Sequence, residues 1–163
     1  MYQRLLVPVD SSPCAAVAAG VAMRLARAFG SHVTLVHMLV NDDPAARERA
    51  SSLLERLSKD ARHPPKQLLE VAAGSLSLAQ SIVNVAQREA SDMILIGTHA
   101  HAHLERKAMG SVAHDVAVLA QIPVLMVPAQ IKKLGFEGRW SQATQGKPLL
   151  EGEERQDAWE RSP

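Results

Sequence analysis

Along the first 128 residues, short apolar runs alternate with longer segments in which apolar residues recur every three or four positions. The short runs have the length and composition of buried β-strands, whereas the longer spacing is typical of helices with one apolar face. Pro, Gly, Ser and Asp separate the two kinds of segment. The pattern predicts four helices, beginning near residues 13, 44, 78 and 111, that alternate with five strands at residues 3–9, 32–39, 66–72, 92–97 and 123–128.

The first strand and helix show how these boundaries are set. Ser11 or Ser12 can cap a helix that begins at Pro13, where a missing N–H group costs nothing. Gly30 supplies a C-terminal stop. The predicted buried stripe of this helix consists of Cys14, Val17, Val21, Leu25 and Ala28.

Strands that alternate with helices predict an α/β fold, because parallel neighbours need crossover connections. Apolar runs such as residues 93–96 need cover on both faces of the sheet. We therefore expect a doubly wound, five-stranded parallel sheet sandwiched by helices. In such sheets ligands bind beyond the carboxyl ends of the strands, where the strand order reverses.

The α/β domain is predicted to span residues 1–130, with residues 131–163 as a C-terminal tail in which the periodicity is lost. Large apolar groups contribute to stability only when they are buried. One hypothesis is therefore that Phe136 and Trp140 dock onto the domain or onto a second copy of the chain, with the acidic remainder of the tail disordered or a short surface helix. The alternative is that the whole tail is a disordered extension.

Charge and composition exclude several functions. Lys and Arg number 18 against 17 Asp and Glu, and aromatics make up only 3%, which argues against nucleic-acid binding. Cys14 is the only cysteine, so an intrachain disulfide and a multi-cysteine zinc site are excluded. With no apolar run of about 18 residues and no recognisable signal peptide, the expectation is a cytoplasmic protein without membrane contact.

Several enzyme motifs are missing. The chain has no Gly-x-Gly-x-x-Gly turn, no P-loop and no Gly-x-Ser-x-Gly elbow. A phospho-receiver domain needs clustered carboxylates, but the first predicted strand ends in the lone Asp10. No catalytic residue is predicted.

The loop at residues 97–112 is the remaining candidate for a binding site. Gly97 leaves the fourth strand, a polar segment follows, and Gly110 and Ser111 open the last helix. Backbone N–H groups at a helix N-terminus, beside a glycine without a Cβ, suit a phosphate group.

This loop, read as Gly97-x2-Ala100-x9-Gly110-Ser111, resembles the Gly-x2-Gly-x9-Gly-Ser/Thr signature of the universal stress protein (UspA) family. The opening LLVPVDSS, the strand DMILIGTHA and the final QIPVLMVP extend the resemblance over residues 1–128. The resemblance implies a nucleotide-binding, HUP-like fold and a homodimer formed through the last strand. It also implies a role in stress response through an unknown protein partner.

The resemblance further implies a site that binds ATP or AMP, with or without Mg²⁺. Asp10 would accept hydrogen bonds from ribose hydroxyls, and Met38 would contact adenine through its backbone. Gly97 would allow close approach. The implied site consists of Pro8, Val9, Asp10, Met38, Gly97, Ala100, Gly110, Ser111 and Val112.

Two alternatives stay open. Ala100 replaces the second glycine of the signature, and if that position needs a positive φ, alanine costs about 1 to 2 kcal/mol. A site closed by Ala100 would leave a dimeric interaction protein of the same fold. A third hypothesis is an enzyme that hydrolyses ATP slowly. His99, His101 and His103 alternate and could present three nitrogens to a metal ion. Because Glu105 is the only nearby candidate for a further ligand, a polar surface loop is the favoured interpretation and no metal site is predicted.

Overall fold

The computed structural model describes residues 2–59, 61–72, 74–98 and 110–129. Within these residues the predicted alternation of strands and helices is confirmed. The elements are β1 (Arg4–Pro8), α1 (Pro13–Phe29), β2 (His32–Leu39), α2 (Pro44–Ser58), β3 (Lys66–Val71), α3 (Leu78–Arg88), β4 (Met93–Thr98), α4 (Ser111–Leu119) and β5 (Val124–Pro128). No helix in the described ranges is long and apolar enough to cross a lipid bilayer.

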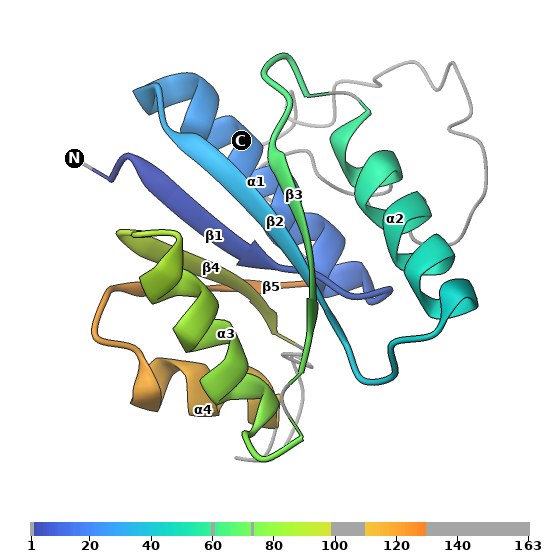
Figure 1. Ribbon diagram of the computed structural model, residues 1–163. Coiled ribbons are helices and arrows are strands. Elements are labelled where there is room, and N and C mark those ends of the chain that lie inside the picture. The colour runs from blue at the N-terminus through green and yellow to red at the C-terminus, as the bar shows by residue number, and fades with distance from the viewer. Residues whose placement is uncertain (1, 60, 73, 99–109, 130–163) are drawn as a thin grey trace, which may run out of the picture.

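The five strands form one parallel sheet in the order β3-β2-β1-β4-β5 (Figure 1). The chain builds the sheet outward from β1 to β3 and then returns to the other side of β1. The strand order therefore reverses between β1 and β4, and the carboxyl ends of these two strands mark the expected ligand position.

Helices cover both faces of the sheet, α1 and α2 on one side and α3 and α4 on the other (Figure 1). Strand β4 contributes to both cores, because Leu95 packs with α1 and α2 whereas Ile94 and Ile96 pack with α3 and α4. The continuous apolar run in this strand is thus explained by its cover on both faces.

Helix α1 has the predicted caps. The Ser12 side chain accepts a hydrogen bond from the Ala15 N–H at 3.3 Å, and Gly30 closes the helix at φ 70°. The predicted stripe is wrong at its end, because Ala28 is exposed. The helix packs most closely on the sheet through its first half, where small side chains let the backbones approach. Its buried small residues are Cys14, Ala15, Ala16, Ala18, Ala19, Gly20 and Ala22.

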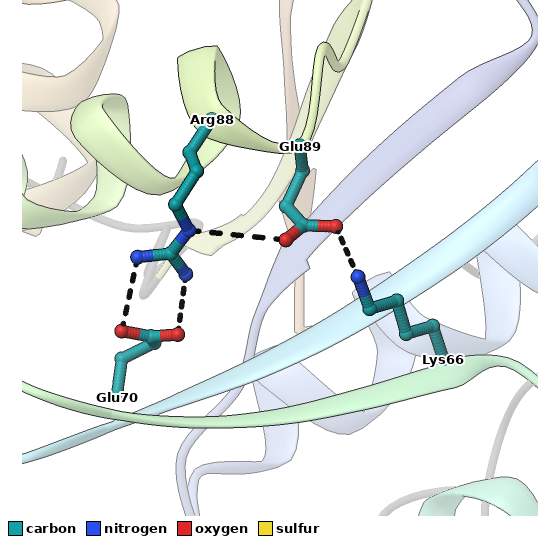
Figure 2. A network of polar contacts seen from close by, with 4 residues as sticks. All are labelled: Lys66, Glu70, Arg88 and Glu89. Atoms are coloured by element: carbon teal, nitrogen blue, oxygen red, sulfur yellow. Dashed lines mark hydrogen bonds and ion pairs between the residues drawn. The ribbon is translucent and has the colours of Figure 1, made fainter.

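Ion pairs join the edge strand β3 to the end of α3 (Figure 2). Lys66 lies 2.6 Å from the Glu89 carboxylate, and the Arg88 guanidinium makes two hydrogen bonds to the Glu70 carboxylate. The hydrogen bond to Glu70 raises the pKa of Arg88, so this guanidinium stays charged. These contacts place charged side chains along one outer edge of the sheet.

Candidate functional site

A cavity of about 260 Å³ opens at the carboxyl edge of the sheet, beside the point where the strand order reverses. Its walls come from the β1–α1 turn, the end of β2, the start of α3, the end of β4 and the start of α4. The structure brings eight predicted site residues together in this cavity: Pro8, Val9, Asp10, Met38, Gly97, Gly110, Ser111 and Val112.

Asp10 organises the β1–α1 turn with one of its carboxylate oxygens. Oδ1 accepts hydrogen bonds from the Ser12 backbone N–H at 2.9 Å and from the Ser12 hydroxyl. The same hydroxyl lies 3.1 Å from the Sγ atom of the buried Cys14. Asp10 thus supports the helix cap, and within the described residues its Oδ2 has no hydrogen-bond partner. A carboxylate in this state can order the turn and still accept a hydrogen bond from a ligand.

Gly97 is needed for packing between β4 and α1. A Cβ atom at this position would lie 2.5 Å from the carbonyl carbon of Cys14 and 2.7 Å from the backbone nitrogen of Ala15. These are backbone atoms of α1, so they cannot move aside as a flexible side chain could. The glycine therefore lets the first turn of α1 approach β4, which also brings Asp10 and Ser12 to the cavity.

Another wall of the cavity is the N-terminus of α4. Gly110 is the N-cap residue, and it makes no side-chain hydrogen bond to the helix. Ser111, the first helical residue, is exposed, and Val112 and Ala113 also line the cavity. The first N–H groups of an uncapped helix carry partial positive charge, which suits an anionic group such as a phosphate.

The sequence did not single out His37, which lies in β2 beside Val9. Its Nδ1 atom is 2.8 Å from the Val9 carbonyl oxygen, and the ring lines the cavity. Strand periodicity identifies neither this contact nor the apolar floor of the site. The other lining residues that the prediction missed are Ser12, Cys14, Ala15, Val36, Leu78, Ile82, Ile96 and Ala113.

A wider groove of about 800 Å³ adjoins the cavity, because Asp10, His37 and Met38 line both. Helix α2 forms its far wall. Near this groove Asp42 makes two hydrogen bonds to the Arg47 guanidinium, one of them of 2.9 Å to Oδ2. The hydrogen bonding to Arg47 lowers the pKa of Asp42, so this carboxylate stays ionised in moderately acidic solution.

Some predicted features lie outside the described residues. They are Ala100, the alternating histidines His99, His101 and His103, and the aromatic residues Phe136 and Trp140. Within the described ranges, no group of three His, Cys, Asp or Glu side chains is arranged to hold a metal ion.

The model of the Universal stress protein family matches residues 1–128, so the chain belongs to this family. Universal stress protein MJ0531 of Methanocaldococcus jannaschii is 28% identical over 141 residues, which cover 78% of this chain and 82% of that protein. Two solved structures share the fold. A universal stress protein from Archaeoglobus fulgidus in complex with dAMP has a TM-score of 0.60 at 24% identity, covering 77% of this chain and 98% of the other. A universal stress protein in complex with cAMP has a TM-score of 0.60 at 21% identity, covering 79% and 98%.

Proposed function

We propose that this universal stress protein is a binding module for an adenine nucleotide, AMP or ATP, with Mg²⁺ accompanying the phosphates of ATP. The observation that carries the proposal is the convergence of residues from five separate segments on one cavity at the strand-order reversal. That cavity offers a carboxylate for ribose hydroxyls on one side and a helix N-terminus for phosphate on the other.

The solved structures that hold dAMP and cAMP support the ligand class, since both ligands are adenine nucleotides. The apolar side chains of Met38, Leu78 and Ile82 add a surface against which a flat base can pack. We further propose that the protein forms a homodimer through β5 and acts in stress response by regulating a protein partner. Its cytoplasmic location remains a prediction.

Calorimetric titration of nucleotide-free protein with AMP, ADP and ATP, in the presence and absence of Mg²⁺, tests the proposal. Asp10→Asn should weaken binding, whereas Asp115→Asn, an equal change on the exposed face of α4, should not. A ligand at about 100 times its Kd should stabilise the fold by about 2.7 kcal/mol. Absence of both heat and thermal stabilisation at millimolar nucleotide would exclude the binding function and favour the interaction protein with a closed site.

The effect of Ala100 on the site has its own test. If the loop needs a positive φ at this position, Ala100→Gly removes a cost of about 1 to 2 kcal/mol and should tighten ATP binding by roughly five- to thirtyfold. The measurement is the Kd of each protein for ATP. An unchanged Kd would show that position 100 does not govern the phosphates.

A further inference from the structure

His37 has a fixed tautomer when its ring is neutral. A carbonyl oxygen can only accept a hydrogen bond, so the 2.8 Å contact with the Val9 carbonyl requires the proton on Nδ1. Nε2 then carries a lone pair and acts as an acceptor. The Val9 contact therefore determines what the other side of the imidazole can recognise.

The Nε2 atom is also accessible. Within the described residues it has no hydrogen-bond partner, and no buried side-chain nitrogen or oxygen there is left without one. An unpartnered Nε2 that is not among the buried atoms is exposed, and the ring lines both the cavity and the adjoining groove. An accessible acceptor at the wall of a binding cavity is available to a ligand donor.

Strand register places the residue His37 close to Asp10. Pro8 pairs with Val36 in the parallel ladder, so His37 lies level with Val9, and Asp10 follows directly. Asp10 contributes the second acceptor, because Oδ2 is without a partner among the described residues. His37 and Asp10 thus each contribute one acceptor to the same cavity, and two acceptors are what the adjacent 2′ and 3′ hydroxyls of ribose need as donors.

We propose that His37 determines sugar specificity: its neutral Nε2 accepts a hydrogen bond from one ribose hydroxyl while Asp10 accepts from the other. The site would then select adenine ribonucleotides over their deoxy counterparts. This inference rests on the proposed function, because it concerns the sugar of the same nucleotide. A deoxynucleotide leaves one acceptor unpaired and should bind about two- to tenfold more weakly.

Two substitutions separate ligand recognition from support of the Val9 carbonyl. In His37→Asn the amide N–H group replaces Nδ1–H and can still reach Val9, but the acceptor at the Nε2 position is lost. In His37→Gln the longer side chain places an amide oxygen near the Nε2 position and loses the donor to Val9. His63→Asn makes the same chemical change at the exposed His63, which lines a different cavity, at the amino edge of the sheet.

The experiment measures Kd values for AMP, 2′-deoxy-AMP and 3′-deoxy-AMP by calorimetry, with thermal unfolding as a check that each variant folds. Wild type and His63→Asn should prefer AMP over at least one deoxynucleotide. In His37→Asn, the two- to tenfold preference for AMP over the deoxynucleotide that lacks the His37-bound hydroxyl should disappear. His37→Gln should keep this preference. Equal affinity of wild type for all three nucleotides would overturn the inference without the use of any variant.

Two other results are informative. Unchanged sugar preference in His37→Asn, with weaker binding and lower stability in His37→Gln, would show that His37 only holds the turn, and would overturn the inference while leaving nucleotide binding intact. Failure of wild type to bind any of the three nucleotides would overturn the proposed function as well.

Discussion

Among single residues, Gly97 has a packing role that its place at the start of the loop 97–112 does not indicate. The Cβ of an alanine there would overlap the backbone of Cys14 and Ala15. Gly97→Ala should therefore destabilise the protein by about 1 to 3 kcal/mol, because the contact forces two backbones apart. Gly74→Ala is the matched control, since a Cβ at Gly74 meets nothing within 4 Å. Urea unfolding of both variants measures the effect, and equal stability would contradict the packing role.

Sequence reasoning identified the residues at the ends of strands and the start of α4 but missed several others that line the cavity. Asp10, Gly110 and Ser111 could be predicted because turn and cap residues mark element boundaries, whereas Pro8, Val9 and Val112 were implied by the family resemblance. His37 and Ile82 lie within regular elements, where the pattern indicates which face is buried but does not identify contacts with distant segments. Their place in the site depends on tertiary packing.

The Asp42–Arg47 pair gives a second prediction at this scale. Hydrogen bonding to Arg47 lowers the pKa of Asp42 below 3.8, so Arg47→Gln should raise it toward that value. Because the pKa of Asp42 is lower in the folded state than in the unfolded state, ionised Asp42 stabilises the folded protein at pH values above the unfolded pKa. This contribution is lost as pH falls through the folded pKa. NMR titration of the Asp42 carboxyl carbon measures the change, with Arg27→Gln at the far end of α1 as control. The same Asp42 pKa in wild type and Arg47→Gln would refute the assignment.

Among the helices, α1 and α3 are each followed by a residue with a positive φ, but the residue types differ. Gly30 ends α1 at φ 70°, and Ala90 follows α3 at φ 49°, a left-handed conformation that strains an L side chain. Gly30→Ala should cost about 1 kcal/mol, since a Cβ there meets no atom within 4 Å and only the backbone is strained. Ala90→Gly should stabilise by up to about 1 kcal/mol, after the entropy of the unfolded chain is counted.

Thermal unfolding of the two single variants tests this contrast. Opposite shifts in Tm are expected, downward for Gly30→Ala and upward for Ala90→Gly. Shifts of the same sign would show that backbone strain does not control these two helix ends.

The elements themselves were largely predictable, and their order in the sheet was not. The β2 bounds of His32–Leu39 agree with the sequence pattern, because apolar runs and caps are local signals. The apolar run in β4 correctly indicated burial on both faces. Nothing local indicates that β4 pairs with β1 rather than β3, since that choice depends on how helices cover the assembled sheet.

At the scale of the whole molecule, the two outer strands of the sheet differ in character. On β3, Lys66 and Glu70 form ion pairs with Glu89 and Arg88 at the end of α3, so this edge carries charged side chains (Figure 2). On β5, the residues VLMVP are apolar, and Leu125 is 39% exposed. Charged side chains discourage pairing between edges, whereas an uncharged apolar edge favours it. Of the two edges, β5 is the better suited to contact a second copy of the chain.

The proposed dimer can therefore be tested at β5. Light scattering coupled to size exclusion should give twice the chain mass for wild type and the monomer mass for Leu125→Lys, because the substitution places a charge in the apolar contact. Gln67→Lys adds the same charge to β3 at the opposite edge and should leave the dimer intact. A wild-type monomer at every concentration, or a dimer that survives Leu125→Lys and dissociates with Gln67→Lys, would exclude β5 as the interface.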